Sequence, residues 1–246
     1  MRYLHLATGS AVLPRPADDG VLLVAPDERF AELRGSDRSA LGALLAGTAP
    51  VADDEQAALA DQVVAWGAGR LAGGPRPLPE RARLTHRLGG VRDQVAARLG
   101  ARLVAGEVLD DDRLLALDAE QAAEGTGGWL PVHRELGHLV AGPLLGAPSR
   151  PAHQPITWAD VRFRRLAASP ARPQLLELWA TWRRHGDRYD LTPPAAELTE
   201  AVRRLSAWLD AGGSLERHQV LVPLDGAPVT THPVLPVPAG LMGLTA

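Results

Sequence analysis

The stretch FAELRGSDRSALGALLAGT, residues 30–48, sets the expected fold of the first part of the chain. Its opening residues, 30–33, form a short run typical of a strand. Ser36 is a suitable N-cap for a helix over residues 37–45, and Gly47 can end that helix. A helix at this place gathers its apolar side chains on one face, namely Leu41, Leu44 and Leu45. The stretch therefore predicts a strand followed at once by a short amphipathic helix.

Three more short runs precede this stretch, at residues 2–6, 11–14 and 21–25. Glycine, Asp-Gly and Pro-Asp turn signals separate them. Together with residues 30–33 they predict a small antiparallel sheet.

A second helix is expected to begin at Asp53, Asp54 and Glu55, because acidic side chains suit the positive end of a helix dipole. Its predicted apolar side carries Leu59, Val63 and Trp66. Several glycines end it, and GGPRPLPE, residues 73–80, has the composition of a linker. We therefore expect two domains, residues 1–74 and residues 81–246.

Strands come first in the chain, and the second part alternates helical and strand patterns. This order indicates an α+β domain followed by an α/β domain. GWLPVHRELGHLVAGPLL, residues 128–145, can form a β-hairpin or two successive strands. The other expected elements are helices over 91–99, 110–123, 159–168, 174–184 and 195–211, a strand over 101–105 and a final strand over 219–222.

The composition of the chain excludes several kinds of catalytic and metal-binding site. The chain has 246 residues, 46% of them hydrophobic, and a formal charge of −3, as expected for a globular protein with a core. It has no cysteine, and all 26 basic residues are arginine. Thiolate metal sites, disulfides, cysteine nucleophiles and catalytic or phosphate-binding lysines are therefore excluded. No apolar run is long enough to span a bilayer and no signal peptide is recognisable, so we expect a cytoplasmic protein without a membrane partner.

Motifs for nucleotides and catalysis are weak. LGGVRDQVAARLG, residues 88–100, lacks the glycine spacing and the preceding apolar strand of a dinucleotide fingerprint. Acidic clusters at 53–54 and 110–112 fit helix starts better than catalytic pairs. No serine lies in a nucleophile-elbow context.

Histidines give no metal signature. His133 and His138 are five positions apart, whereas the zincin motif needs two histidines four apart. We expect one exposed and one partly buried histidine beside a strand. His153, His218 and His232 are scattered, so a metal site built from them stays open without a positive sign.

Arginines form the remaining feature, with Arg162, Arg164 and Arg165 in one cluster and Arg183, Arg184 and Arg188 in another. They can form a patch for an acidic peptide or protein, since guanidinium groups pair carboxylates well, or simply a solvated helix face. The clusters have no aromatic platform and the chain is acidic overall, so we expect no nucleic-acid partner.

Three segments resemble known families. Residues 30–48 resemble the PqqD-like winged-helix recognition element of peptide natural-product pathways. Residues 128–169, and HPVLPVPAGLMG at 232–243, resemble the later portion of the ThiF-like (E1-like) partner proteins of YcaO cyclodehydratases, which make thiazoles and oxazoles. The resemblance implies a winged-helix-like recognition domain followed by a degenerate α/β ThiF-like domain.

The chain departs from that family in two ways. The two cysteine pairs that hold zinc in family members are replaced by residues 153–158 and 239–242, so no zinc is expected. The terminal segment is then expected to be held by packing of Val234, Leu235, Val237, Leu241 and Met242, or else to be a frayed apolar tail. The nucleotide-binding entry of ThiF-like enzymes is also unrecognisable, so we expect no cofactor and no catalytic residues.

The resemblance implies that the protein binds the leader of a ribosomally made precursor peptide and presents its core to a separate YcaO cyclodehydratase or another maturation enzyme. The leader would add a strand to the sheet edge. Phe30, Leu33 and Trp66 can instead be simple core residues. The residues expected to bind the leader are Phe30, Ala31, Glu32, Leu33, Arg34, Arg38, Ala58, Asp61, Gln62, Ala65 and Trp66.

Two alternatives stay open: an ATP-dependent ThiF-like adenylating enzyme and a winged-helix DNA-binding regulator. The acidic residues of the second helix disfavour the regulator, because a DNA reader needs basic or amide side chains there. Two copies could also associate as a homodimer.

Overall fold

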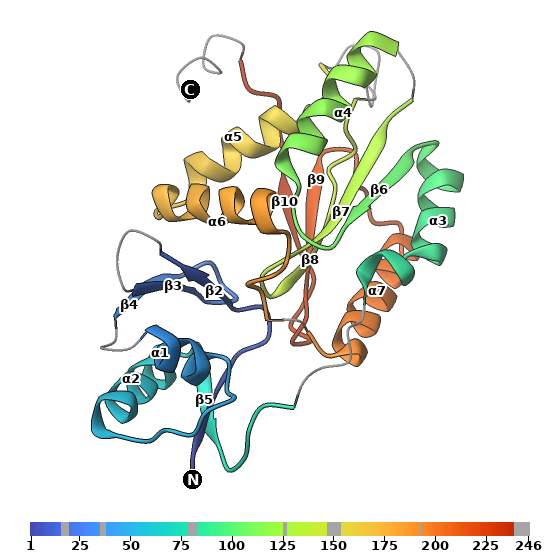
Figure 1. The fold of residues 1–246 in the computed structure, drawn as a ribbon. Helices are drawn as coiled ribbons and strands as arrows, with labels where there is room; N and C mark the ends of the chain where they lie inside the picture. The colour runs from blue at the N-terminus through green and yellow to red at the C-terminus, as the bar shows by residue number, and fades with distance from the viewer. Residues whose placement is uncertain are drawn as a thin grey trace.

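The computed structural model describes residues 1–15, 20–34, 38–77, 83–124, 127–146, 154–191 and 193–238. Within these ranges the chain forms seven α-helices, one 3₁₀ helix and ten strands in three sheets (Figure 1). The architecture is thus mixed α and β, as expected. Residues 78–82, which contain the end of the predicted linker, lie outside the described ranges, so the proposed domain boundary remains a prediction.

The first part contains the predicted antiparallel sheet, in the order β2–β3–β4. Its strands are Ala11–Pro14, Gly20–Val24 and Phe30–Arg34. The expectation that residues 2–6 join this sheet was wrong, because β1 (Tyr3–Leu6) pairs antiparallel with β5 (Gly69–Ala72). No strand was expected at β5, since its glycine-rich surroundings indicated a helix end and linker.

Two helices follow the sheet, α1 (Arg38–Leu45) and α2 (Asp54–Ala65). Asp53 caps α2, its Oδ1 accepting a hydrogen bond from the Gln56 N–H at 2.8 Å. Asp54 and Glu55 then occupy the first turn, which confirms the helix start that the acidic cluster predicted. Gly47 has a φ of +70° just past α1, as a helix-ending glycine requires.

The sheet β2–β3–β4 is covered on both faces. Side chains of Val21, Leu23 and Leu33 belong to one hydrophobic cluster with α1 and α2. Leu13, Leu22 and Val24 belong to another, with Leu178, Trp179 and Trp182 of α6 (Arg172–His185). Since side chains alternate between the faces of a strand, the first part therefore shares its core with the second.

The second part is built on a five-stranded sheet in the order β10–β9–β8–β7–β6. The helices and strands of this part lie close to the predicted residue ranges. Only β6 and β7 run parallel within it. The strands are β6 (Arg102–Gly106), β7 (Trp129–Glu135), β8 (His138–Ala141), β9 (His218–Pro223) and β10 (Thr230–Pro233). Strand β10 shows that residues 219–222 are not the final strand, and β7 and β8 form the hairpin rather than two separate strands.

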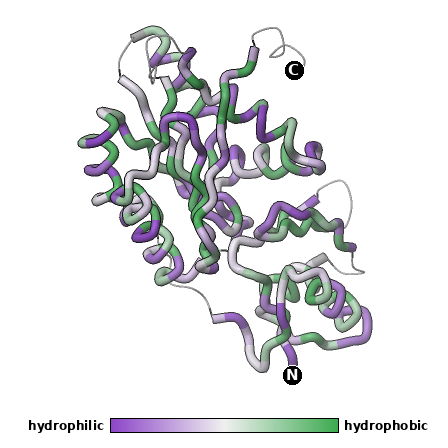
Figure 2. Tube along the Cα trace, turned by 180° about the vertical axis from the view of Figure 1, so that it is seen from behind, coloured by the Kyte–Doolittle hydropathy of each residue, from purple (hydrophilic) through white to green (hydrophobic). Residues whose placement is uncertain are grey.

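Helices cover both faces of this sheet. On one side lie α3 (Gly89–Leu99) and α7 (Ala195–Asp210), with the 3₁₀ turn Leu84–His86; on the other lie α4 (Asp111–Glu124), α5 (Trp158–Ala168) and α6. Figure 2 shows apolar and polar residues alternating around the helices, as expected for amphipathic helices packed on a sheet.

The segment after β10 is partly packed. Val234 and Val237 are buried, as predicted, but Leu235 is 50% exposed, so its predicted role in packing was wrong. The Val237 N–H donates to Asp160 Oδ1 at 2.6 Å, and the Arg164 guanidinium donates to the carbonyls of Leu235 and Pro236. Residues 234–237 are therefore held by hydrogen bonds as well as packing and are not a frayed tail. Leu241 and Met242 lie outside the described residues.

Candidate functional site

Strand β4 is the edge of the first sheet. It pairs with β3 on one side, and no strand of the described chain pairs with its other side. Ala25 N–H donates to Arg29 O, and the alternation of antiparallel ladders then turns the main-chain groups of Ala31 and Leu33 toward β3. The main-chain groups of Phe30 and Glu32 consequently point outward. The opposite edge, β2, is covered, since Val12 N–H donates to Tyr189 O.

A hollow of about 440 Å³ lies at the carboxyl end of β4, between α1 and α2. We call it the β4 hollow. Its apolar lining includes Leu41, Leu44 and Leu59, while Arg34 lies on its β4 side and Asp53 and Glu55 on the α2 side. The hollow thus combines an apolar floor with charges of both signs.

The predicted leader-binding residues divide into three groups. Leu33 is buried, as the simple-core alternative expected, and Ala31 and Trp66 are half-buried against the same cluster. Phe30 is half-buried against the core shared with α6. The exposed residues are Glu32, Arg34, Ala58, Asp61, Gln62 and Ala65, and the side chain of Arg38 lies outside the described part.

The β4 hollow brings Arg34, Ala58 and Gln62 together. Asp61 and Ala65 lie on the same helix outside its lining. Trp66 instead carries the guanidinium of Arg29, 5.1 Å from its ring centre. The apolar residues of the lining were missed from sequence. Leu41 and Leu44 are buried and belong to the core cluster, so their sequence pattern is that of a plain core face.

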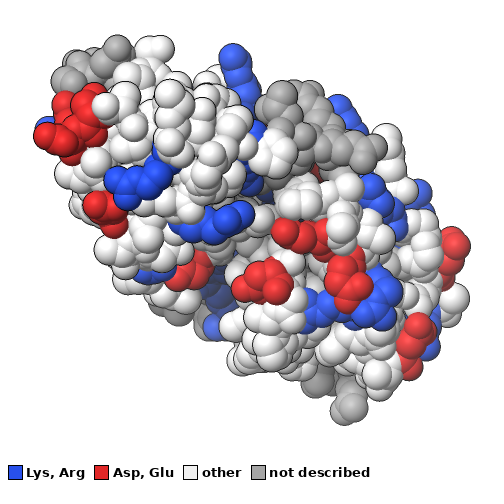
Figure 3. Space-filling model, turned by 90° about the horizontal axis from the view of Figure 1, so that it is seen from below, with Lys and Arg blue, Asp and Glu red and all other residues white. Residues whose placement is uncertain are grey.

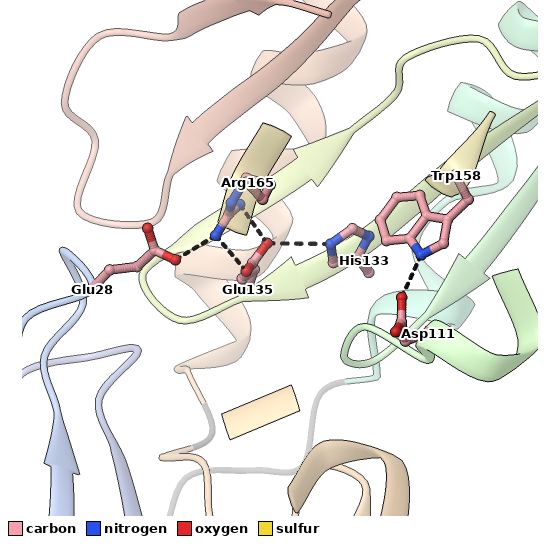
Figure 4. A network of polar contacts seen from close by, with 6 residues as sticks. All are labelled: Glu28, Asp111, His133, Glu135, Trp158 and Arg165. Atoms are coloured by element: carbon pink, nitrogen blue, oxygen red, sulfur yellow. Dashed lines mark hydrogen bonds and ion pairs between the residues drawn. The ribbon is translucent and has the colours of Figure 1, made fainter. Parts of the chain in front are cut away.

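A buried polar network connects the two parts of the chain (Figure 4). Arg165 of α5 donates to Glu135 of β7 at 2.8 and 3.0 Å, and also to Glu28 in the turn between β3 and β4. His133 Nε2 lies 3.5 Å from Glu135 Oε2. His133 is only 3% exposed and His138 is half-buried, so the expectation that one of them is exposed was wrong.

The same network sets the ionisation of Glu135. Burial alone would raise its pKa, but the charge of Arg165, followed by a hydrogen bond from His133, outweighs burial and lowers the pKa to about 2. Glu28 is less enclosed, and its burial outweighs Arg165, which leaves its pKa above the usual value. The pair Glu135–Arg165 is thus a fixed ion pair at neutral pH.

The arginine cluster has an internal role that neither alternative foresaw. Arg162 pairs with Asp111 at 2.9 Å, and Asp111 also accepts from the Trp158 indole N–H at 2.6 Å. Arg162 and Arg165 therefore pair with carboxylates of the same chain, whereas Arg183 of the second cluster is exposed and pairs with Asp112 at the surface. The helix-start interpretation of residues 110–112 holds, because Asp110 Oδ1 accepts from the Arg113 N–H.

The carboxyl ends of parallel strands are the usual nucleotide site of α/β proteins. Here the hollow at the end of β6 and β7 measures only about 20 Å³. One acidic and one basic side chain line it, Asp110 and Arg113. Nucleotide sites are typically hundreds of Å³, so a hollow of this size is too small for ATP.

Neither a metal-binding cluster nor a membrane-spanning helix is present among the described residues. Among the described residues, no group of three or more histidine, aspartate or glutamate side chains could hold a metal ion. None of the helices in the described ranges has the length and apolar composition needed to cross a membrane.

Comparison with known proteins gives remote likenesses only. No family model matches the chain, and no curated protein matches it. Among solved structures, "E. coli Microcin synthetase McbBCD complex" is similar at 12% identity and a TM-score of 0.41, over 96% of this chain and 98% of that one. At such values the alignment establishes neither a shared family nor a shared activity.

Two further structures are similar at 14% identity and a TM-score of 0.37. One is "Heterocyclase in complex with substrate and Cofactor", over 94% of this chain and 38% of that one. The other is "Structure of the heterocyclase TruD", over 95% and 41%. The chain therefore spans less than half the length of these two proteins.

Proposed function

We propose that this protein binds the leader segment of a ribosomally made precursor peptide along the edge of β4 and presents the rest of the peptide to a separate enzyme, a YcaO-type azoline-forming cyclodehydratase or another maturation enzyme. The observation that carries the proposal is the edge of β4, with outward main-chain groups at Phe30 and Glu32 and the β4 hollow at its end. The family resemblance of residues 30–48 points to the same edge.

Strand addition suits this edge physically. An extended peptide can exchange main-chain hydrogen bonds with the outward groups of β4, which gives affinity along its length. Its side chains point alternately to the two faces of the sheet, so a side chain on the face that carries α1 and α2 can reach the β4 hollow. The leucines there favour an apolar side chain, and Arg34 on one side and Asp53 on the other favour charged neighbours.

The second part of the proposal is that the protein presents the bound peptide to another enzyme. Binding the leader raises the effective concentration of the attached core at a partner's active site. The alternative of an adenylating enzyme is less well supported, because the hollow at the end of β6 and β7 measures only about 20 Å³. A DNA-binding regulator is opposed by the exposed acids of α2, Asp54, Glu55 and Asp61.

The test is a titration of the full chain into the fluorescein-labelled amino-terminal half of a short precursor peptide encoded beside it, followed by fluorescence anisotropy. Glu32→Pro removes an N–H that points away from β3, so it leaves the β3–β4 ladder intact while blocking strand addition. We expect affinity to fall by more than about tenfold, the loss of one or two hydrogen bonds.

Two controls accompany that variant. Glu32→Gln keeps the N–H and should bind nearly as the parent chain does. Thr231→Pro places the same substitution on the other edge strand, β10, at an N–H that also points away from its neighbour, and should leave binding unchanged. Equal binding by Glu32→Pro and the parent chain, with both folded by circular dichroism, would reject strand addition at β4.

A further inference from the structure

A groove lies between the two parts of the chain, and it begins where β4 begins. It consists of two hollows of about 710 and 450 Å³ that share Ala7, Thr8, Gly67 and Glu197. We call it the central groove. Figure 3 shows a face of the molecule on which the surface is hollowed between two lobes, with acidic and basic side chains beside the hollow.

The central groove is continuous with the β4 edge. Arg29, the residue before β4, lines the smaller hollow, and its guanidinium lies over Trp66, which ends α2. Gly67, the next residue, lines both hollows. A path therefore leads from the β4 hollow at Arg34, along β4, past the Arg29–Trp66 pair and into the groove.

The lining of the groove suits an extended main chain. Glycines and alanines occupy part of its walls, namely Ala7, Gly67, Gly69, Gly137, Ala195, Ala196 and Ala227. Small side chains let another backbone approach closely. Charged side chains, among them Asp27, Arg70 and Asp225, line the rest of the groove and can pair with polar groups of a peptide.

Glu197 supplies a second, independent observation. Its Oε2 atom is buried and has no hydrogen-bond partner within the described residues, and the side chain lines both hollows. Arg29 pairs with Asp27 at 2.8 Å. The charge of Arg76 interacts with Glu197, but Arg76 donates its hydrogen bond to the Leu6 carbonyl at 3.2 Å rather than to this oxygen. A buried carboxylate oxygen without a donor is costly, and the N–H groups of an extended peptide would satisfy it.

We infer that the central groove holds the residues of the precursor peptide that flank the segment on β4, so that the peptide leaves the recognition edge by one fixed end. This inference rests on the proposed function and adds a direction to it. The peptide end at Phe30 enters the groove, and the end at Arg34 stays outside.

The test uses peptides displayed on phage. Random peptides of about eight residues, enough to cover the five residues of β4, are selected on the full chain and counter-selected on Glu32→Pro. The best binder is then extended by random residues at one end or the other and reselected. We expect extension at one end alone to improve affinity by about tenfold or more, as a linked second contact should.

Variants of α7 locate the gain. Ala196→Trp fills the groove from an exposed position, and Glu197→Gln weakens the buried acceptor. Each should return the extended peptide to the affinity of the short one while leaving the short peptide unaffected. Ala207→Trp, an exposed position on the same helix outside the groove lining, should retain the full gain.

The outcomes separate the two proposals. If no selected peptide depends on the β4 edge, the proposed function fails and this inference fails with it. If peptides depend on the edge but gain equally from either extension, or keep the gain in Ala196→Trp, only the central groove is overturned.

Discussion

Arg165 of α5 donates a hydrogen bond to Glu28, which precedes it by 137 positions and lies in the turn between β3 and β4. The same guanidinium forms two hydrogen bonds with Glu135, at 2.8 and 3.0 Å. One arginine thus connects the β2–β3–β4 sheet to the five-stranded sheet.

Arg165→Met should destabilise the fold strongly. It leaves the buried Glu135 carboxylate without its main partner, and losing one member of a buried ion pair typically costs about 3–5 kcal/mol. Glu28→Gln should change stability by less than about 1 kcal/mol, because the Glu28 side chain is 37% exposed and its burial outweighs the attraction of Arg165. Urea unfolding measures both. Arg183→Met, which breaks the exposed pair with Asp112, is the control; a similar cost in Arg183→Met and Arg165→Met would contradict the role of Glu135–Arg165.

Acid should weaken the fold through Glu135. Its pKa is lowered to about 2 in the folded chain, below the unfolded value of about 4.3, so its stabilisation is present above pH 4.3 and is lost as the pH falls toward 2. The unfolding free energy at pH 3 should therefore be lower than at pH 6. Glu135→Gln should show a flatter acid limb; an unchanged acid limb would show that other carboxyl groups cause it.

Asp118 should act with the opposite sign. Burial raises its pKa to about 6, although the N–H groups of Trp158 and Ala159 partly oppose the shift. Its contribution is therefore most favourable below about pH 3.9 and is lost as the pH rises through 6. Asp118→Asn keeps an acceptor for these N–H groups and should gain about 1 kcal/mol at pH 7.5, discounted for partial exposure, but nothing at pH 3.5. Equal gains at both pH values would exclude a titration effect.

Filling the β4 hollow should weaken peptide binding without unfolding the chain. Ala58 is exposed on α2 and lines the hollow, so Ala58→Trp occupies the space proposed for a leader side chain. We expect about a tenfold loss of affinity by anisotropy, comparable to removing one buried apolar anchor. Ala46→Trp, at an exposed site outside the hollow lining, is the matched control and should bind normally.

Asp160→Ala should release the segment after β10. Asp160 is buried and accepts from the Thr157 N–H at 2.8 Å and the Val237 N–H at 2.6 Å. Leaving these donors unpaired should cost about 2–3 kcal/mol. Limited proteolysis should then cut near residues 234–238 sooner than in the parent chain. Thr157→Ser keeps the helix cap and should not change the cleavage rate.

Helices were the most predictable elements. Asp53, Gly47 and Gly100 mark their ends by local chemistry, and Gly100 indeed closes α3 with a φ of +58°. Strand pairing was less accessible, because β5 has four residues and finds its partner β1 more than sixty positions earlier. The pairing of β10 was hidden by its proline, Pro233, and by its exposed side chains.

The candidate site was predictable only in outline. Local patterns predicted the edge strand and α2, and the resemblance implied their role in leader binding. The hollow depends on how α1 and α2 pack, which local patterns do not encode. The role of Arg165 was missed for the same reason. A cluster of arginines usually faces solvent, and nothing in the sequence near Arg165 shows that Glu135 and Glu28 reach it.

The apolar face of Leu13, Leu22 and Val24 has an evolutionary consequence. Helix α6 covers this face. A fusion that joined only the first 74 residues to a new enzyme would therefore expose an apolar surface that promotes aggregation. Such a graft becomes soluble only if the recipient supplies a substitute for Trp179 and Trp182. Recombination should therefore conserve both halves as one inherited unit.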